Sequence, residues 1–305
     1  MAEPTTYHLP VLVGPVLAAA AGARRAVDAT LGGGGHTEAL RAAGMEVLAI
    51  DRDPEAIAFA RSRLGDDRVR YLEASYHSPG ALEAVADFRP GFVLLDLGVS
   101  SHQLDAEARG FTFRPGAPLD MRMEGRGPSA AELLNRLEEG ALERIFADYG
   151  DERRARRLAR EVVRRRERSP FAVSDDLVNA IRATLGPRSG PSEFARLFQA
   201  VRIAVNEELA GLAHALPGFR DALQPGGALA VITYHSGEDR LVKLAFREWA
   251  SACVCLPHQP VCTCRGRPLG RLEPRKPILP SEDEIAANPR ARSAKLRIFR
   301  VEHAA

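Results

Sequence analysis

Short apolar runs alternate with helix-like stretches through the first part of the chain. The runs that predict strands are 25–30, 46–51, 69–74 and 92–98. The stretches between them show helical spacing, and Asp53 followed by Pro54 is typical of an N-cap and first helical position. Strands that alternate with helices of roughly ten to fifteen residues indicate βαβ units and a parallel, doubly wound sheet.

The pattern changes after the fourth run. From Ser129 to about Thr184 the chain shows helical signals and no strand pattern, and Ser129 with Glu132 matches a capping box. Strand patterns return at 226–235 and 294–302. This order predicts a helical block inserted into an α/β sheet.

The expected domain borders follow from this change of pattern. We expect one α/β domain in two parts, 1–108 and 196–305, with an all-helical insertion at 109–195 that is a candidate for RNA recognition. The segment 197–219 has helical spacing throughout, so we expect it to return the chain to the sheet as one long packing helix.

Composition and charge place the chain among ordinary soluble globular proteins. Its 305 residues are 45% hydrophobic and 27% charged, and a formal net charge of +2 favours no nucleic-acid partner by itself. The apolar stretch 9–21 is similar to a signal peptide, but Glu3 precedes it, Pro10 and Pro15 interrupt it, and it is too short to span a bilayer. We therefore expect a cytoplasmic protein that does not enter a membrane.

A glycine-rich loop follows the first predicted strand, in the sequence VDATLGGGGHTEAL at residues 27–40. A P-loop would close the glycines with Lys and Ser or Thr, and here His36 and Thr37 follow. A dinucleotide fingerprint would place its last glycine at Thr37 or Glu38, so that pattern fails as well. S-adenosylmethionine remains as a ligand, beside the simpler alternative of a structural turn.

The acids near this loop favour S-adenosylmethionine. Asp28 precedes the glycines, and a carboxylate there suits a cationic sulfonium and would repel pyrophosphate. Asp51 ends the second predicted strand nineteen residues after Gly32, where it can accept hydrogen bonds from ribose hydroxyls. NAD enzymes share that spacing, so Asp51 supports an adenosine ligand without choosing between the two cofactors.

Two further strand ends carry suitable groups. Tyr76 follows the third predicted strand, where an aromatic ring can lie against adenine, although a core or rim aromatic is the commoner role of such a residue. The fourth strand ends in LLDLGVSSHQL, which offers Asp96, Ser100, Ser101 and Gln103. Because ligands of doubly wound sheets bind beyond the carboxyl ends of the strands, these residues are expected to meet at one site.

Longer motifs are more specific than the glycine loop. They include DATLGGGGHTEAL, AIDRDPEAI, FQAVRIAVNEEL, TYHSGEDRLVK and, most specific of all, LLDLGVSSHQLDAEARGFTFRPGAPLDMRM. Over about residues 7–302 the chain resembles the bacterial small-subunit (16S) ribosomal RNA cytosine-N4 methyltransferases. The resemblance implies a Rossmann-like, seven-stranded S-adenosylmethionine methyltransferase sheet with an inserted all-helical domain. It also implies methyl transfer to the exocyclic N4 of a cytosine in the decoding centre of 16S ribosomal RNA.

The resemblance also assigns a cofactor site. Carried over residue by residue, the family's cofactor positions fall on Gly34, Gly35, His36, Asp51, Asp96 and Gln103, with Tyr76 where other members carry phenylalanine. His102 and Gly237 stand where the family often has proline and leucine, which leaves the local loop conformation open.

Methyl transfer to N4 is an in-line displacement that depends on positioning and requires no metal. The N4 lone pair is delocalised into the ring, so acceptors for the N4 protons would help the reaction. The Asp/Asn-Pro-Pro-aromatic motif of many amino-methyltransferases is absent, since Leu97 and Gly98 follow Asp96. The catalytic residues are therefore unknown, with Asp96, Ser100 and His235 as candidates and a structural strand-end histidine as the alternative for His235.

Two arginine-rich segments are candidates for contact with RNA phosphate, since a target cytosine has to be splayed out of its stack. Residues 151–168 hold nine Arg against four acids, and residues 265–300 hold ten basic against four acidic residues. The alternative is a solvated helix face with i,i+4 pairs such as Glu161 with Arg165. For a methyltransferase of RNA, we expect at least one segment to contact the substrate.

All four cysteines lie in the segment CVCLPHQPVCTC, as Cys253, Cys255, Cys262 and Cys264. Four thiolates can hold a tetrahedral zinc ion, but C-x-C is tighter than the usual zinc spacing. A cytoplasmic setting disfavours disulfides. Free thiols in a loop are the favoured interpretation, zinc and disulfides stay open, and no metal is assigned to the active site.

Other functions stay open from the sequence alone. They are a methyltransferase of another RNA or of protein, a non-catalytic rRNA-binding assembly factor and, more weakly, an NAD oxidoreductase. The expected cofactor is S-adenosylmethionine, and the expected partner is 16S rRNA within the small ribosomal subunit. A homodimer is possible.

Overall fold

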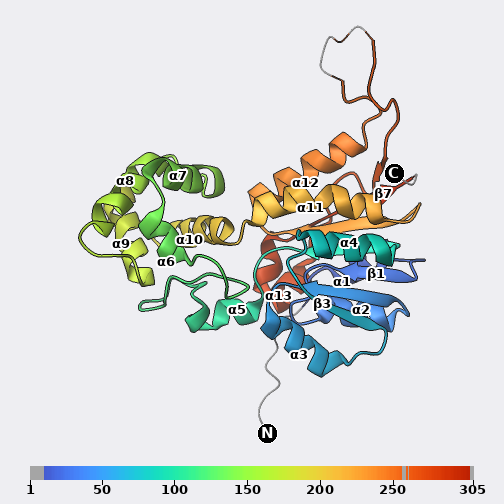
Figure 1. Cartoon of the computed structure of the whole chain (residues 1–305), viewed down its shortest axis with the longest axis horizontal. Coiled ribbons are helices and arrows are strands. Elements are labelled where there is room, and N and C mark those ends of the chain that lie inside the picture. Colours follow the sequence, from blue (N-terminus) through green and yellow to red (C-terminus); the bar gives the residue numbers. More distant parts are fainter. Residues whose placement is uncertain (1–9, 256–258, 260, 303–305) are drawn as a thin grey trace. The chain divides into compact units, whose positions relative to one another are not determined.

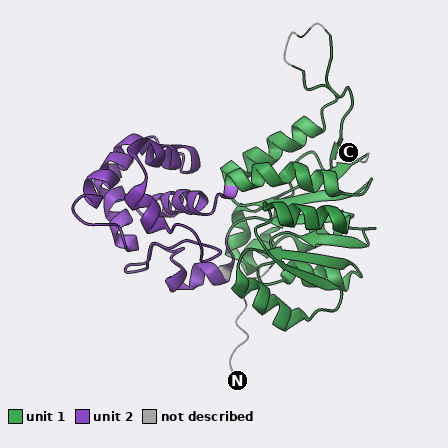
Figure 2. Ribbon diagram, viewed as in Figure 1, with its two compact units in different colours: residues 1–98, 209–305 green, residues 99–208 purple. Residues whose placement is uncertain are grey.

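The chain folds into two compact units in the computed structural model, which describes residues 10–255, 259 and 261–302 (Figure 1). The first, here called the sheet unit, contains residues 1–98 and 209–305, and the second, the helical unit, contains residues 99–208 (Figure 2). The helical unit therefore interrupts the sheet unit once along the chain.

A seven-stranded mixed sheet forms the centre of the sheet unit. Its strands follow the order β3-β2-β1-β4-β5-β7-β6. The first five strands in this order are parallel, β7 is antiparallel to β5, and β6 is antiparallel to β7. The bounds are β1 Arg25–Asp28, β2 Glu46–Asp51, β3 Val69–Glu73, β4 Phe92–Asp96, β5 Ala228–Thr233, β6 Gly270–Leu272 and β7 Lys295–Val301. The predicted α/β class and six strands are confirmed, and β6, with three residues, was too short to leave a pattern.

Helices cover both faces of this sheet (Figure 1). The apolar core on one face includes side chains of α1, α2 and α3, and the core on the other face includes side chains of α4, α11 and α12. Parallel strands covered in this way are buried on both sides, and all six residues of β5 are buried. The bounds are α1 Val13–Ala19, α2 Gly35–Ala42, α3 Pro54–Leu64, α4 Pro79–Phe88, α11 Glu208–Ala222, α12 Ser236–Trp249, α13 Glu282–Ala287 and the 3-10 helix η3 Pro289–Ser293.

The helix starts read from the sequence are present in the sheet unit. Asp53 caps α3 by accepting from the backbone N–H of Glu55 at 3.0 Å, and Pro54 is its first residue. The apolar stretch that is similar to a signal peptide contains α1, which packs against the sheet, and its first residue, Leu9, lies outside the described residues. In the described part of the chain, no helix is long and apolar enough to cross a membrane.

The helical unit has an apolar core of its own, to which α6 through α10 contribute. Ser129 and Glu132 form the capping box that their spacing predicts at the start of α6. Within residues 99–208, the only β-pairing is an isolated bridge between Pro118 and Val173. The bounds are α5 Ser101–Asp105, η1 Glu107–Arg109, α6 Ala130–Arg136, α7 Glu139–Arg144, the π-helix η2 Ile145–Tyr149, α8 Ala155–Arg166, α9 Ser174–Leu185 and α10 Pro191–Val205.

The one long packing helix expected at 197–219 is in fact two helices. The chain breaks between α10 and α11, where Glu207 has a left-handed backbone with φ of 52°. The buried Asn206 side chain donates to Met121 O at 2.7 Å and accepts from Met123 N at 3.0 Å, which ties the junction to the helical unit. α10 thus packs in the helical unit, and the units divide at 98 and 208 rather than at the expected 108 and 195.

Candidate functional site

The candidate site lies at the carboxyl ends of the parallel strands in the sheet unit. The strand order reverses between β1 and β4, and doubly wound sheets bind their ligands at such a switch point. Asp28 ends β1, Asp51 ends β2 and Asp96 ends β4, so three carboxyl groups share this edge. Grouped acids of this kind suit a ligand that carries positive charge.

The glycine-rich loop leads from β1 into α2. Gly32 and Gly34 have φ values of 49° and 79°, and a Cβ on Gly34 would lie 2.9 Å from Leu64 Cδ1. A Cβ on Gly35 would lie 2.8 Å from the Pro10 ring. The loop therefore needs glycine for its backbone conformation and for its packing. The first amides of α2 have no acceptor within the helix, so they are available to an anionic group such as a carboxylate.

Asp28 orders this loop from within the sheet unit. Its side chain is only 1% exposed and accepts from Thr37 Oγ1 at 2.7 Å and from Thr30 N at 3.3 Å. Burial raises the pKa of Asp28, although His36 and the Thr37 hydrogen bond lower it. The direct contact with a cationic ligand that the sequence led us to expect is not available to a side chain enclosed in this way.

Asp51 holds the same loop from the neighbouring strand. Its Oδ2 accepts from Gly32 N at 2.8 Å, and its Oδ1 accepts from Asp53 N at 2.9 Å. Burial raises the pKa of Asp51 to about 6, although these two backbone bonds lower it. Each carboxylate oxygen can accept more than one hydrogen bond, so Asp51 is also able to accept from a ribose hydroxyl, and that role stays a prediction.

Asp96 belongs to a polar network at the end of β4. Tyr234 donates its hydroxyl hydrogen to Asp96 Oδ1 at 2.9 Å, and His36 Nε2 lies 3.4 Å from Asp96 Oδ2. The backbone N–H of Asp96 donates to Thr30 Oγ1 at 2.6 Å, which joins β4 to the loop after β1. The network fixes the position of this carboxyl group at the switch point.

The two side-chain partners of Asp96 favour their protonated forms. Burial, the Asp96 charge and their hydrogen bond raise the pKa of Tyr234 far above its usual range, so its hydroxyl remains a donor. Burial lowers the pKa of His36, but the contact with Asp96 and the charges of Asp96 and Asp28 outweigh it and raise the pKa overall. Neither His36 nitrogen reaches good hydrogen-bond geometry with a described residue, so the 3.4 Å contact with Asp96 is an ion pair when the imidazole is protonated.

Tyr76 lies in the loop after β3. Its half-buried ring packs against Phe219, with centroids 6.4 Å apart, and edge-on to His77 at 5.4 Å. The His77 ring lies against Gly211, where an added Cβ would be 1.8 Å from Nδ1. The buried Ser75 Oγ has no hydrogen-bond partner among the described residues. The Tyr76 ring thus lies beyond the carboxyl end of β3, as expected, and its stacking on adenine stays a prediction.

His235 lies at the start of α12. Its Nδ1 is 3.4 Å from the backbone N of Glu238, which it caps, and its Nε2 is 3.1 Å from Glu238 Oε1. Glu238 is 2% exposed and also accepts from Tyr234 N at 2.9 Å. These contacts fit the structural alternative for His235, and a part in catalysis stays a prediction.

Ser100 and Gln103 belong to the helical unit. They form a capping box at the start of α5, in which Ser100 Oγ accepts from Gln103 N at 3.2 Å and Gln103 Oε1 accepts from Ser100 N at 3.0 Å. Gln103 is buried within this turn. The contacts explain the local fold, and the assignment of both residues to cofactor or substrate stays a prediction.

The sequence did not reveal two residues that contact or influence candidate site residues, Tyr234 and Glu284. Tyr234 stands in the quoted TYHSGEDR motif beside His235, but only the pairing of β5 with β4 brings its hydroxyl to Asp96. Glu284 of α13 accepts from Leu12 N at 2.5 Å, and its charge contributes to the raised pKa of His36. No local signal in the sequence points to either contact.

A hollow of about 830 Å³ lies at the amino ends of the parallel strands, at the opposite end of the strands from the candidate site. Residues that precede or begin the strands line it, among them Arg25, Glu46 and Gly91, together with Arg300. Arg25 pairs with Glu46 and Arg300 pairs with Glu273, so these charges are matched within the protein. The hollow is therefore no part of the candidate site.

Comparison with known proteins gives the family. The model of the MraW methylase family matches residues 5–302. Ribosomal RNA small subunit methyltransferase H of Gemmatimonas aurantiaca is 58% identical over 300 residues, which cover 97% of this chain and 95% of that protein. The protein of the same name from Heliobacterium modesticaldum is 45% identical over 304 residues, which cover 95% and 97%. The chain belongs to the MraW methylase family.

Among solved structures, an rRNA methylase from Streptococcus thermophilus aligns with a TM-score of 0.39 and 12% identity, covering 92% of this chain and 87% of that one. The α/β fold of this chain follows from its strand order and from the helices on both faces of the sheet.

As a member of the MraW methylase family, this chain is an enzyme that uses S-adenosylmethionine as its methyl donor. The residues at the carboxyl edge fit that cofactor. Asp51 and Asp96 suit its hydroxyl and cationic groups, and the first amides of α2 suit its carboxylate. The loop also lacks the lysine that a triphosphate would require.

Proposed function

We propose that this chain transfers the methyl group of S-adenosylmethionine to the exocyclic N4 of a cytosine in the decoding centre of 16S ribosomal RNA. The observation that carries the proposal is the match of nearly the whole chain to the MraW methylase family and to proteins named small-subunit rRNA methyltransferases. The target atom and its place in the RNA rest on the motif resemblance, above all on residues 94–123.

The reaction needs positioning and a way to remove charge from N4. S-adenosylmethionine, when bound, supplies a methyl group on a sulfonium as the electrophile. The protein has to hold N4 in line with that group and accept hydrogen bonds from its protons. Asp96 is the best candidate acceptor, because it ends β4 at the switch point and Tyr234 and His36 hold it in place.

Replacement of Asp96 tests this role. We expect Asp96→Ala to weaken donor binding and to slow methyl transfer, because the same carboxylate faces a cationic cofactor and the N4 protons. Asp87→Ala is the matched control, since Asp87 is exposed on α4 and the same charge is lost there. Donor binding is measured by calorimetry and transfer with labelled donor, and full methylation by the Asp96 variant would remove it from the site.

The substrate is tested by incubating small ribosomal subunits with labelled S-adenosylmethionine. The proposal expects label in 16S rRNA, and nuclease digestion followed by mass spectrometry should find it on N4 of a single cytosine. Label in protein would favour a protein methyltransferase, and binding to subunits without transfer would favour an assembly factor. An RNA digest from a strain that lacks this protein should miss the same modification.

We further infer that the enzyme works in the cytoplasm on the small subunit or its precursor, as an rRNA substrate requires. A homodimer stays a prediction, and sedimentation of the purified chain with and without small subunits measures it.

A further inference from the structure

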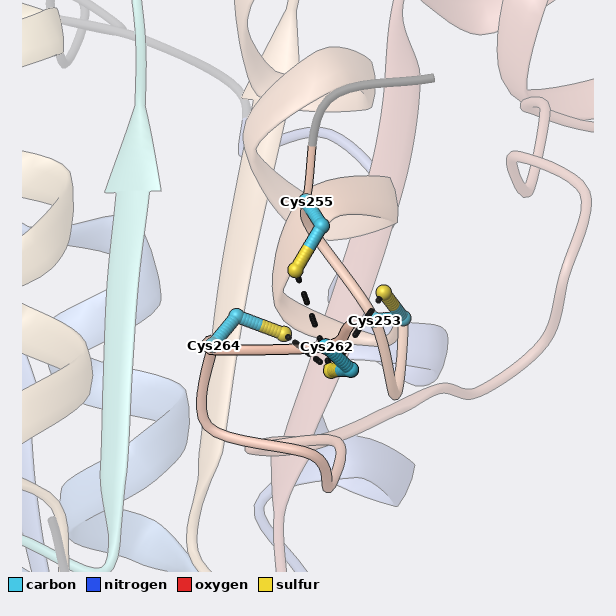
Figure 3. A group of neighbouring side chains, drawn as sticks. All are labelled: Cys253, Cys255, Cys262 and Cys264. Carbon is cyan, nitrogen blue, oxygen red and sulfur yellow. Dashed lines mark hydrogen bonds between the residues drawn. The ribbon is translucent and has the colours of Figure 1, made fainter. Parts of the chain in front are cut away.

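Four cysteine thiols converge in the segment that joins α12 to β6, residues 250–269 (Figure 3). Residues 256–258 and 260 of this segment lie outside the described residues. The Sγ atoms of Cys253, Cys255, Cys262 and Cys264 all lie within 4.8 Å of one another. In the rest of the described chain, no group of three or more His, Cys, Asp or Glu side chains forms a comparable set of metal ligands.

The distances between the sulfurs match a tetrahedral metal site. Cys262 Sγ lies 3.8 Å from Cys253 Sγ, 3.7 Å from Cys255 Sγ and 3.5 Å from Cys264 Sγ. Zinc–sulfur bonds of about 2.3 Å in tetrahedral geometry separate the sulfurs by about 3.8 Å. A disulfide would require a separation of about 2.05 Å. The sulfurs are therefore spaced as the ligands of one ion would be, and none of these three separations is that of a bonded pair.

Contacts made by neighbouring residues hold the segment in this arrangement. Arg265 donates to the backbone oxygens of Glu248 and Ser251, and its guanidinium lies 3.4 Å from the Glu248 carboxylate. The backbone N–H of Leu269 donates to Trp249 O at 2.8 Å. Both contacts tie the second C-x-C to the end of α12, which immediately precedes the first. The meeting of the two pairs thus follows from the fold of the segment.

The backbone of the segment also holds one of the sulfurs. Val254 N donates to Cys264 Sγ at 3.3 Å, and this contact joins the first C-x-C to the second.

We propose that Cys253, Cys255, Cys262 and Cys264 bind one zinc ion in a closed tetrahedral site. Four protein ligands leave no open coordination position, so the ion organises the segment and takes no part in methyl transfer. Binding converts each thiol to a thiolate, releases up to about four protons and leaves the site with a formal charge of about −2. The spacing of the cysteines favoured free thiols, and the convergence of their sulfurs in space changes that interpretation.

Metal analysis of the full chain tests the proposal. Protein purified with reductant and without chelator should contain about one zinc ion per chain by mass spectrometry of the metal. Chelator should remove it, and added zinc should restore it. Cobalt(II) added in its place should give the strong visible absorption of tetrahedral thiolate coordination.

Variants connect the metal to the thiols. We expect C255S/C264S to hold less than a tenth of the zinc of the unaltered chain. Val261→Ser is the matched control, because Val261 is 69% exposed in the same segment and the new side chain is the same. The control should keep one zinc ion per chain. The double variant should still bind S-adenosylmethionine, so failure of the zinc site and failure of the proposed methyl transfer are separate results.

Three outcomes would overturn the proposal. Four thiols that react freely with a thiol reagent after zinc has been offered would establish free cysteines. Thiols that react only after reduction, in protein without metal, would establish disulfides. Iron in place of zinc, lost in the double variant, would establish an iron site. If C255S/C264S does not fold by circular dichroism, removal and return of zinc on the unaltered chain decides the question.

Discussion

At the scale of single residues, Asp51 is the group whose charge state should govern cofactor binding. Burial raises its pKa to about 6, so the ligand-free protein takes up a proton there as the pH falls from about 7 to about 5. An ionised carboxylate accepts hydrogen bonds through both oxygens, whereas the protonated form has less capacity to accept. Cofactor binding should therefore favour the ionised form and release the proton.

We accordingly predict that the affinity for S-adenosylmethionine is highest above about pH 7. Below about pH 6 it should fall by up to about tenfold per pH unit. Calorimetry between these values measures it. Asp51→Asn is the control, because the amide keeps the shape but does not titrate, so its weaker binding should not change with pH through this range. Equal pH profiles for the two proteins would show that another group is responsible.

Tyr234 should act on the reaction through Asp96. Tyr234→Phe removes only the hydroxyl that donates to Asp96 Oδ1, and a lost hydrogen bond to a charged group corresponds to a rate reduction of about tenfold or more. We expect this loss in kcat for methyl transfer. Tyr71→Phe makes the same chemical change where the hydroxyl donates to Gly65 O, and its rate should stay unchanged. A Tyr234 variant as fast as the Tyr71 variant would contradict the role.

These residues show what the sequence could reveal at this scale. The places of Asp51 and Asp96 at strand ends were predictable, because an apolar run fixes where a strand ends and the acid follows at once, and their roles in binding stay predictions. Tyr234 was not predictable, since it is 138 positions from Asp96 and meets it only through the sheet. Asp28 was interpreted as a contact for a cationic ligand. Its carboxyl group is instead buried and accepts hydrogen bonds from Thr37 and Thr30 of the loop, which the sequence pattern does not reveal.

At the scale of elements, some of the arginines in and around α8 form ion pairs within the protein, and others are exposed to solvent without one. Arg160 pairs with Glu139, and Arg164 and Arg165 pair with Glu161, as the i,i+4 alternative foresaw for part of the helix. Among the described residues, the exposed arginines here with neither an ion pair nor a side-chain hydrogen bond are Arg153, Arg156, Arg157 and Arg168, whereas Arg154 donates to Thr184 O and Leu185 O. Only this second set has charge to spare for RNA phosphate.

We predict that R153A/R156A/R157A weakens binding to small-subunit RNA and reduces the slope of log affinity against log salt by about 2 to 3, if all three arginines contact phosphate. The control R160A/R164A/R165A loses the same charge from paired positions and should change the slope much less. Filter binding over a range of salt measures both. Equal slopes in the two variants would show that α8 does not contact the RNA.

Asn206 should set the stability of the junction between α10 and α11. Asn206→Ala leaves the buried Met121 O and Met123 N without their partner, which costs about 2 kcal/mol or more of unfolding free energy. Asn179→Ala, on the exposed face of α9, should cost less than about 0.5 kcal/mol. Urea unfolding followed by circular dichroism measures both, and similar midpoints would contradict the structural role of the buried amide.

Elements were predictable where local pattern decides them and not where packing does. The apolar runs of the central strands and the cap at Asp53 are local signals, and both are present in the structure. The break at Asn206 is not local, because Met121 and Met123, which bind its side chain, lie more than eighty positions earlier in the chain. Helical spacing continues across that break, so periodicity alone joined α10 to α11.

At the scale of the whole molecule, the ends of the insertion lie beside one turn of the sheet unit. A Cβ on Gly98 would be 3.7 Å from the Tyr234 ring, and a Cβ on Gly237 would be 3.4 Å from Leu209 Cδ1. Both ends are therefore next to the turn that joins β5 to α12. A helical unit with its own core and closely spaced ends has the features of a domain that can be removed without loss of the sheet.

Two excisions distinguish the observed borders from those expected from the sequence. Replacement of residues 99–208 by a short Gly/Ser linker should leave a soluble sheet unit that binds S-adenosylmethionine more weakly than the whole chain, because Gln103 is lost, and transfers no methyl group. Removal of 109–195 instead keeps part of α10, whose Phe198 and Val201 then lack the core that buries them, and this protein should aggregate. Gel filtration and circular dichroism compare the two. Should the second protein be the soluble one, the insertion ends near residue 195, and α10 belongs with the sheet.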